Sequence, residues 1–338
     1  MMLNKNPVEP FVVKGKGSLE DVLERMGKLS FQARQLGLSF KVWQRMLEDE
    51  TFIFLGLAGA MVPAGMRKIV SFLIEKRLID CLVSTGANLF HDLYETLGGK
   101  HYQGTPFVDD IKLKEEGVDR IYDTLAPEEG FRKADNFIAE FARTLDRNHS
   151  YTTREFIYYL GENLAKKGKE KGIITAAYEK KLPIYCPAIG DSSIGIALAA
   201  DKVFLNFDVA RDVYETAFLS GKAKRTGVIY IGGGTPKNFI QQTQVTLSLI
   251  GEEKGGHYYA IQIITDPPHW GGLSGCTLEE AQSWGKIAPE ARKVTLYCDA
   301  TVALPLLVEA LALRLKEGFK RSFIPQFEMG KNIKIINI

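Results

Sequence analysis

The sequence predicts an α/β fold with a mostly parallel sheet, helices on both faces of that sheet, and further helices at the N-terminus. Short continuous apolar runs alternate with helical segments, which is the pattern of strands that are buried on both faces. Several of these runs end in small and polar residues. The sequence contains no internal repeat, low-complexity segment or clear linker, so we expect one main domain.

The first part of the chain has the periodicity of helices. Apolar residues recur at helical spacing from Leu19 to Met26 and again from Ser39 to Leu47. We expect one or two helices here, before the sheet begins. The chain therefore divides into an N-terminal helical segment, residues 1–50, and a single α/β domain, residues 51–338.

From Phe52 onward the apolar runs have the composition of buried strands. They lie in residues 52–57, 79–88, 181–193, 227–235, 258–266 and 293–301. Helical segments follow four of them, at residues 66–78, 194–200, 236–250 and 302–315. Two stretches interrupt the alternation: we expect loops and a short helix in residues 97–135, and a solvated, lysine-rich helix end in residues 164–174.

Composition limits the possible partners. The 338 residues are 45% hydrophobic and 25% charged, with a formal net charge of +2, which gives no electrostatic reason to expect a nucleic acid. The four cysteines form no CxxC pair, so we expect free thiols in a reducing compartment. No signal-peptide core is present, and the most apolar stretch, Thr51 to Met66, is too short and too broken to span a membrane. A cytoplasmic location is expected.

Glycine-rich strand ends indicate a nucleotide. Ligands of such sheets bind beyond the carboxyl ends of the strands, where backbone N–H groups at a helix start can hold a phosphate. The run from Ile231 to Pro236, IGGGTP, fits this arrangement although it is not GxGxxG. Asp191 and Asp299 each end a strand run, where a carboxylate either accepts hydrogen bonds from a ribose or caps the next helix.

The stretch around Lys286 has the most distinctive chemistry. Thr277 with Glu280 fits a capping box, and Gly285 predicts a left-handed helix end, so Lys286 would lie just past a short helix that also presents Trp284. A lysine held against an aromatic ring and partly desolvated loses proton affinity, and its neutral amine can attack a carbonyl or imine carbon. The alternative is a solvated surface lysine beside a capping glutamate and a core tryptophan.

The five histidines show no metal-ligand spacing, and we expect no metal site. His91 follows the second strand end and is the histidine that we expect to reach the site. The others are interpreted as surface or structural residues, namely His101, His149, His257 and His269.

Together these motifs resemble those of deoxyhypusine synthases, over about residues 15–315. The resemblance is carried by SFQARQLG from Ser30, AGMR from Ala64, LVSTGANLFHDL from Leu82, CPAIGDSSIG from Cys186, YIGGGTPKN from Tyr230, EEAQSWGK ending at Lys286, and YCDAT from Tyr297. The WGK triplet together with the GGG and DAT strand ends makes the resemblance specific.

The resemblance implies a Rossmann-like fold, NAD as cofactor, and a homotetramer with active sites at subunit interfaces. Enzymes of this family oxidise spermidine with NAD, pass the aminobutyl imine to a lysine, transfer it to an acceptor amine and return the hydride. The resemblance assigns the imine to Lys286 and places Trp284, Glu280, His91 and Asn238 in the substrate pocket. It assigns the cofactor to Gly59, Ala60, Thr85, Gly86, Asp191, Gly232, Gly233, Gly234, Thr265, Asp299 and Ala300.

The sequence departs from the family pattern in the amine-binding half. The family has a Glu-Glu pair where this chain has Phe90-His91, acids where it has Ile196 and Leu273, and a histidine where it has Asn238. Because a buried ammonium needs a charged partner, these replacements predict an altered amine pocket. With its unperturbed pKa of about 6.5, His91 would serve either as a base or as a partner for a carboxylate on a different substrate.

Three functions follow. The first is a deoxyhypusine synthase-like transferase that uses NAD and a Lys286 imine to move an alkylamine group from a polyamine-type donor to a small-molecule amine or a protein lysine. The second is authentic deoxyhypusine or homospermidine synthesis from spermidine, and the third is a non-enzymatic NAD-binding protein. Intact Glu280, Trp284 and Lys286 favour the first two, and the substitutions at Ile196 and Leu273 favour the first.

Overall fold

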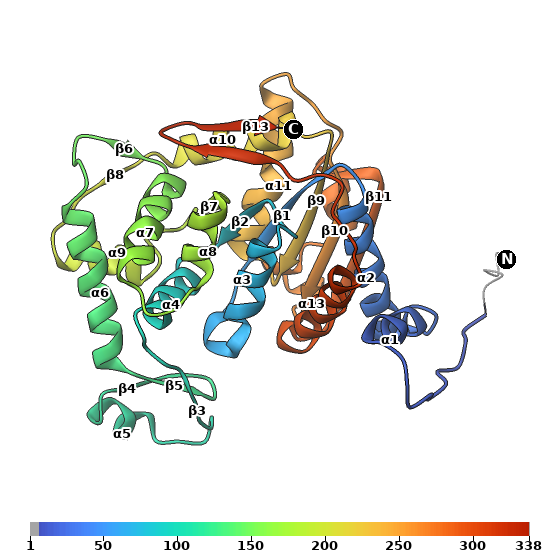
Figure 1. Cartoon of the computed structure of the whole chain (residues 1–338), viewed down its shortest axis with the longest axis horizontal. Helices are drawn as coiled ribbons and strands as arrows, with labels where there is room; N and C mark the ends of the chain where they lie inside the picture. The colour runs from blue at the N-terminus through green and yellow to red at the C-terminus, as the bar shows by residue number, and fades with distance from the viewer. Residues whose placement is uncertain (1–6, 338) are drawn as a thin grey trace.

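The central sheet of the computed structural model confirms the predicted α/β class. The structure describes residues 7–337, with the exception of the side chain of Leu273. Six strands are hydrogen-bonded in the order β11-β10-β9-β1-β2-β7, and all neighbouring pairs are parallel (Figure 1). Their bounds are β1 Thr51–Leu57, β2 Cys81–Ser84, β7 Ile184–Tyr185, β9 Arg225–Ile231, β10 His257–Ile264 and β11 Ile287–Tyr297.

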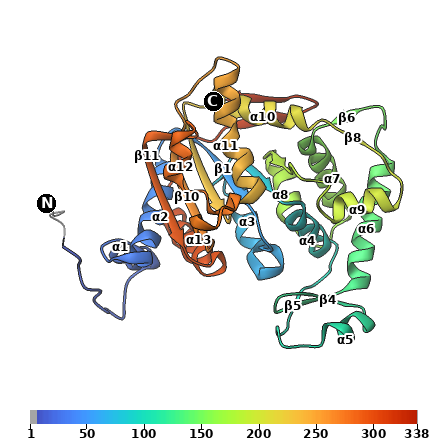
Figure 2. The ribbon, with the colours of Figure 1, turned by 180° about the vertical axis from the view of Figure 1, so that it is seen from behind.

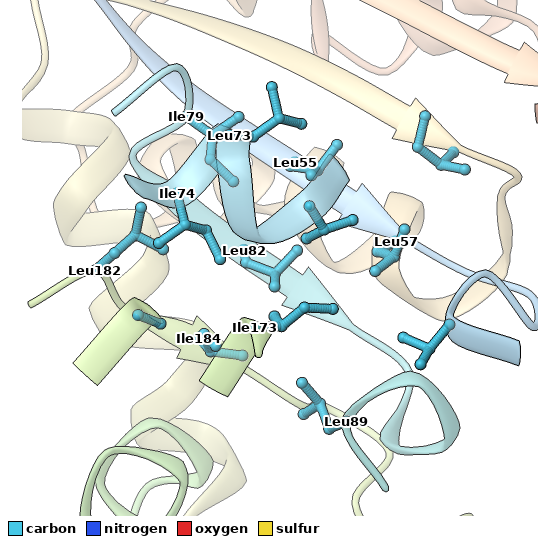
Figure 3. Packing of buried hydrophobic residues seen from close by; sticks show 14 of the residues in the cluster. Leu55, Leu57, Leu73, Ile74, Ile79, Leu82, Leu89, Ile173, Leu182 and Ile184 are labelled. Atoms are coloured by element: carbon cyan, nitrogen blue, oxygen red, sulfur yellow. The ribbon is translucent and has the colours of Figure 1, made fainter. Parts of the chain in front are cut away.

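Helices cover both faces of this sheet, as the apolar runs predict. Side chains alternate along each strand, so Ile53 and Leu55 of β1 pack into one core and Phe52 and Phe54 into the other. One face carries α2 Phe31–Glu48, α3 Arg67–Glu75 and α13 Ala300–Lys316, and the opposite face carries α10 Val209–Lys222, α11 Gly234–Leu249 and α12 Leu278–Ser283 (Figures 1 and 2). Figure 3 shows the first core where strand and helix side chains such as Leu55, Leu73 and Leu82 meet.

The predicted N-terminal helices are confirmed as two, α1 Leu19–Met26 and α2. Ser18 begins α1 with a capping box, because its hydroxyl and the carboxylate of Asp21 exchange hydrogen bonds with backbone N–H groups. The predicted charged helix end is also present, since α7, Thr153–Lys167, ends in a lysine pair and Lys166 lies 2.7 Å from Glu162.

The prediction for residues 97–135 was wrong in part. This stretch holds a helix, α5 Asp110–Glu115, but also a three-stranded antiparallel sheet of β3 Tyr102–Gln103, β5 Thr124–Pro127 and β4 Val118–Ile121. Its strands are two to four residues long and mostly half-buried or exposed. Such strands are too short to show an alternation of apolar and polar residues.

Most of the remaining elements lie on the β2 and β7 side of the sheet or above it in Figure 1, and three short helical turns follow the carboxyl ends of β1 and β10. They are the π-helical turn η1 Val62–Met66, α4 Gly86–Thr96, α6 Glu128–Arg143, α8 Ile173–Lys180, α9 Ser193–Ala200, β6 Ser150–Tyr151 with β8 Asn206–Phe207, the 3-10 turns η2 Pro268–Trp270 and η3 Leu273–Gly275, and the C-terminal hairpin of β12 Gln326–Met329 and β13 Ile333–Asn337. Among the described helices, none combines the length and apolar character needed to cross a bilayer.

Strand order locates the place where a ligand is expected. The chain runs from β1 outward to β2 and β7, and then returns to β9 on the other side of β1 before continuing to β10 and β11. Leu57, the last residue of β1, pairs with both Ser84 and Ile231, so the three strands end level with one another. The carboxyl ends of β1 and β9 therefore form the topological switch point of the sheet.

Candidate active site

The structure brings the predicted cofactor residues to one edge of the sheet. Each follows the carboxyl end of a parallel strand, and we call this set the strand-end edge: Gly59 and Ala60 after β1, Thr85 and Gly86 after β2, Asp191 after β7, Gly232 to Gly234 after β9, Thr265 after β10, and Asp299 and Ala300 after β11. A Cβ added to Gly190 or Gly234 would meet no atom within 4 Å, and one added to Gly59 would meet only the side chain of Met61, at 3.6 Å, so the backbone here borders open space.

Helix starts at this edge offer backbone N–H groups. The N-cap residues of α4, α9 and α11 are Thr85, Ser192 and Gly233, and none of the three makes a side-chain capping hydrogen bond within the described residues. The first turns of these helices therefore lack a side-chain acceptor at the N-cap, a role that an anion such as a phosphate can fill.

The two aspartates of the strand-end edge differ. Oδ1 of Asp299 accepts hydrogen bonds from the backbone N–H and the hydroxyl of Thr301, both at 2.7 Å, so this side chain caps α13. These bonds lower the pKa of Asp299. Asp191 is exposed and is not the N-cap of α9, which is Ser192. Of the two roles weighed for these residues, capping therefore applies to Asp299 and not to Asp191.

A cavity of about 610 Å³ adjoins the strand-end edge. Residues Val62 to Gly65, which follow Ala60, form one wall, and Thr301, which follows Ala300, forms another. The small sheet closes the remaining side, with Tyr102, Gln103 and Thr124. We call it the hairpin cavity, after the strands β3 and β5 that line it. Sequence reasoning did not find it, because it depends on the sheet in residues 97–135.

A second cavity, of about 280 Å³, contains the predicted nucleophile. Four of the five predicted substrate residues line this lysine cavity: Asn238, Glu280, Trp284 and Lys286. The fifth, His91, is not among its lining residues. Lys237, Gln241, Pro268, Gly271, Gly272 and Cys276 complete the lining.

Local structure positions Lys286 as the sequence predicts. Gly285 has φ +66°, the left-handed conformation expected after α12. The backbone N–H of Lys286 donates to the Ala281 carbonyl at 3.0 Å, and its own carbonyl accepts from the N–H of His257 at 3.0 Å. Nζ lies 5.3 Å from the centre of the Trp284 ring, within cation–π range. The lysine is thus fixed at both backbone groups while its side chain faces the cavity.

Only half of the predicted capping box forms at α12. The hydroxyl of Thr277 accepts from the N–H of Glu280 at 2.9 Å, but the reciprocal bond to the Glu280 carboxylate is not made among the described residues. That carboxylate lines the lysine cavity instead. It is therefore available to a cationic substrate rather than committed to the helix end.

Lys237 is the charged residue of this cavity that sequence reasoning missed. It is 1% exposed, and its Nζ donates to Oε1 of Gln262 at 3.1 Å and to the backbone carbonyls of Ser274 and Cys276. Burial lowers its pKa to about 8. The expectation of a buried, pKa-lowered lysine thus applies to Lys237, while Lys286 is half-buried. A lysine in the first turn of a helix, where a cation is unfavourable, was the available signal.

His91 lies elsewhere, on α4. Its Nδ1 is 3.0 Å from Nε2 of His101, and Nδ1 of His101 is 2.7 Å from a carboxylate oxygen of Glu95. Burial, and then the nearby His101, lower the pKa of His91 to about 4. The expected pKa near 6.5 is therefore not found, and His91 is neutral at pH 7. The side chain of His101 is buried and bonded to Glu95 and His91, which agrees with its interpretation as a structural residue.

The chain is similar in sequence to deoxyhypusine synthases. Residues 21–311 match the family model described as deoxyhypusine synthase. "Probable deoxyhypusine synthase 2" of Methanosarcina acetivorans is 52% identical over 92% of this chain and 91% of its own length. "Probable deoxyhypusine synthase 1" of Archaeoglobus fulgidus is 42% identical, covering 89% and 96%. The "Deoxyhypusine synthase-like protein" of Coxiella burnetii is 40% identical, covering 85% and 83%.

Solved structures share the fold at low sequence identity. A crystal structure from Entamoeba histolytica, provisionally described as a deoxyhypusine synthase, aligns with a TM-score of 0.63 and 18% identity over 93% of this chain and 98% of that one. The ternary complex of AgrE with ornithine and NAD+ aligns with a TM-score of 0.54 and 14% identity over 86% of this chain and 34% of that one. Both likenesses concern the fold.

We expect Lys237→Met to loosen the loop that follows β10, because the carbonyl of Cys276 would lose its side-chain donor and that of Ser274 would keep only the one from Nε2 of Gln262. Amide hydrogen exchange in residues 271–277 should become faster by about tenfold or more, the equivalent of one or two hydrogen bonds of about 1 kcal/mol. Lys286→Met is the matched control, since Nζ of Lys286 makes no hydrogen bond within the described residues. Unchanged exchange in the Lys237 variant would contradict the anchoring role.

The pH dependence of stability gives a second check on Lys237. Its pKa is about 8 in the folded chain, against about 10.4 for an unperturbed lysine. Between these values the unfolded chain binds more protons than the folded chain, so the free energy of unfolding of the wild type rises with pH in this window. In chemical denaturation, the wild type should gain stability relative to Lys237→Met as the pH rises through this window.

Proposed function

Because the chain belongs to the deoxyhypusine synthase family, whose enzymes are NAD-dependent aminobutyl transferases, we propose that it moves an alkylamine group from a polyamine-type donor to an amine acceptor through Lys286. The observation that carries the proposal is the lysine cavity. It combines a backbone-fixed Lys286 with an aromatic face at Trp284 and a carboxylate at Glu280. These are the groups needed to hold a cationic amine beside a nucleophile.

In the proposed reaction Lys286 is the covalent residue. Its neutral amine attacks the imine carbon of the oxidised donor, and the bond from that carbon to the departing amine breaks. The acceptor amine then attacks the lysine-bound imine carbon and releases Lys286. Glu280 would hold the ammonium end of the donor, and the exposed ring of Trp284, at 5.3 Å from Nζ, would cover its alkyl chain.

We propose that NAD binds along the strand-end edge. Open backbone at Gly190 and Gly234 leaves room for a ligand, and the starts of α4, α9 and α11, which no side chain caps, suit its phosphates. Asp191, which is exposed and makes no cap, would accept hydrogen bonds from ribose hydroxyls. When bound, NAD would accept a hydride from the donor amine and return it, so the net reaction is a transfer.

The family resemblance also supports a homotetramer with shared active sites. Within one chain His91 does not line the lysine cavity, while Ile196 and Trp284 are 62% and 66% exposed. We propose that a second copy brings its His91 and Ile196 surface to the lysine cavity. The four free cysteines agree with a cytoplasmic location for this assembly.

The amine pocket is proposed to differ from that of conventional synthases. Ile196 on α9 and His91 on α4 stand where the family resemblance places acids, and neither carries a negative charge. Leu273 stands at a third such position, but its side chain lies outside the described part of the chain. A less cationic amine than spermidine is therefore the favoured donor, and the acceptor is a small amine or a protein lysine.

The second candidate is authentic deoxyhypusine or homospermidine synthesis from spermidine. Archaeal relatives that are 42% to 52% identical carry the name of deoxyhypusine synthases, which favours this candidate. An adduct on Lys286, the binding of NAD and the efficiency with spermidine separate it from the altered transferase and from an NAD-binding protein without activity.

Lys286→Arg should abolish transfer, because a guanidinium keeps the charge but does not form the imine. The wild type should be incubated with NAD and a polyamine panel, reduced with cyanoborohydride and digested for mass spectrometry. An alkylamine adduct on Lys286 is expected, and turnover of the variant should fall by about 10³-fold or more. Lys133→Arg, on an exposed residue of α6, is the control. Full activity of Lys286→Arg would overturn the assignment.

Gly190→Val should weaken NAD binding by about tenfold or more, equal to about 1.4 kcal/mol, because the new side chain would occupy the open space beside Asp191. Gly330→Val, in the C-terminal hairpin, is the matched control, since an added Cβ there meets no atom closer than 3.9 Å. Calorimetry measures both. The proposed site fails if the wild type does not bind NAD at millimolar concentration or if both variants bind it equally.

Ile196→Asp should raise the catalytic efficiency with spermidine by restoring an anionic partner. A close charge pair changes binding by about 2–5 kcal/mol when one partner is removed, so an increase of about tenfold or more is expected, mostly in KM. Ile196→Asn supplies a neutral control of similar size. If the wild type already uses spermidine as efficiently as a conventional deoxyhypusine synthase, the pocket is not altered.

A further inference from the structure

A chain of hydrogen bonds joins three side chains on and beside α4. Nδ1 of His91 contacts Nε2 of His101 at 3.0 Å, and Nδ1 of His101 contacts a carboxylate oxygen of Glu95 at 2.7 Å. Glu95 comes one helical turn after His91, while His101 lies in the loop before β3. The helix and the loop are therefore tied to each other through the two imidazoles.

The charge on Glu95 determines which atoms donate and which accept in these hydrogen bonds. The carboxylate lies 3.5 Å from the guanidinium of Arg67, which is 3% exposed and also pairs with Asp92 at 2.8 Å. An ionised carboxylate only accepts hydrogen bonds, so Nδ1 of His101 carries its hydrogen. When His101 is the neutral imidazole, its Nε2 is an acceptor, and Nδ1 of His91 carries the hydrogen between the rings. The lone pair of His91 is consequently on Nε2.

Packing holds the two rings in this arrangement. The ring of Phe131 lies 5.3 Å from that of His91 and 4.7 Å from that of Tyr94, and Phe90 flanks His91 at 5.7 Å. His101 itself is 6% exposed. His91 is half-buried, and its Nε2 makes no hydrogen bond within the described residues. This nitrogen is the one that remains for a ligand.

We propose that Glu95 and His101 are positioning residues that fix His91 as a neutral hydrogen-bond acceptor at Nε2 for an N–H group of the amine substrate. The inference rests on the proposed function and narrows its substrate class. An acceptor at this position fits an amine or ammonium and rejects a carboxylate, which would leave two acceptors facing each other. Of the two roles considered for His91, pairing with a substrate carboxylate is thereby excluded.

The tautomer can be measured without any substrate. Solid-state ¹⁵N NMR of histidine-labelled protein should show His91 protonated at Nδ1 and unprotonated at Nε2, with the signals assigned through His91→Gln. His101→Leu removes the acceptor for Nδ1–H and should move the hydrogen to Nε2. His101→Gln should keep the wild-type tautomer, because its amide oxygen can take the place of the imidazole Nε2.

A second His–Glu pair supplies the matched control. Nε2 of His149 lies 3.1 Å from a carboxylate oxygen of Glu155, outside both cavities. His149→Gln should leave the His91 signals and the kinetics unchanged. Glu95→Gln should mix the two tautomers of His91, since the amide no longer requires a hydrogen on Nδ1 of His101.

The effect on recognition is measured with putrescine and γ-aminobutyrate, which differ by an amine and a carboxylate at one end. The wild type should bind putrescine more tightly in competition assays. In His101→Leu the preference should shift toward γ-aminobutyrate by about tenfold or more, since a hydrogen bond to a charged group contributes about 1.5–3 kcal/mol. His101→Gln should retain the wild-type preference, and kcat should change less than KM.

The outcomes separate this inference from the proposed function. A wild-type His91 protonated at Nε2, or a tautomer unchanged in His101→Leu, overturns the positioning role. If the tautomers are as expected but the ligand preference does not shift, His91 does not contact the substrate. Failure of Lys286 to form an adduct, with the tautomers and preferences as expected, overturns the proposed transfer while the amine-binding role of His91 stands.

Discussion

Parallel pairing of all six strands is the constraint on which this site depends. Because both faces of the sheet are buried under helices, polar groups have room only beyond the strand ends or outside the covering helices. The carboxyl ends supply the glycines and Asp191, but Lys286 precedes β11 and so belongs to the opposite end of its strand. The short helix α12 connects the two ends of the sheet, since it runs from the loop after β10 back to Lys286. The lysine cavity accordingly reaches from Pro268 to Lys286.

Two lysines line that cavity, and their different surroundings indicate different roles. Nζ of Lys237 has three oxygen acceptors, as many as an ammonium has hydrogens, and lies almost out of contact with water. It is bound to the protein on every side and is suited to hold the loop. Nζ of Lys286 faces an aromatic ring instead, which holds a cation without taking its hydrogens. The charge of Lys286 also contributes to lowering the pKa of Lys237, so the two ammonium groups disfavour each other.

Sequence periodicity was enough for the sheet, its covering helices and the approach to Lys286, because those features come from runs of apolar residues and from local cap chemistry at Thr277 and Gly285. The features that it missed depend on contacts between distant segments. Lys237 is buried by the loop after β10, and the hairpin cavity requires strands too short to show a pattern. The pairing of His91 with His101 was also invisible, although Glu95 stands four residues after His91, because a loop brings the second ring back onto the helix.

Those distant contacts change how the departures from the family pattern are interpreted. Read along the chain, replacing an acid by His91 removes a negative charge from the amine-binding half. In the structure Glu95 is bonded to His101, which is bonded to His91. A carboxylate is therefore still present, but two imidazole rings separate it from Nε2 of His91. The carboxylate forms an ion pair with Arg67. Its remaining effect on His91 is to determine which ring nitrogen carries the hydrogen. In the proposed role, an amine that meets Nε2 of His91 would find an acceptor without a net charge, which favours recognition by hydrogen-bond geometry over attraction between ions. Such a site discriminates between amines by where their N–H groups lie, and less by how many charges they carry.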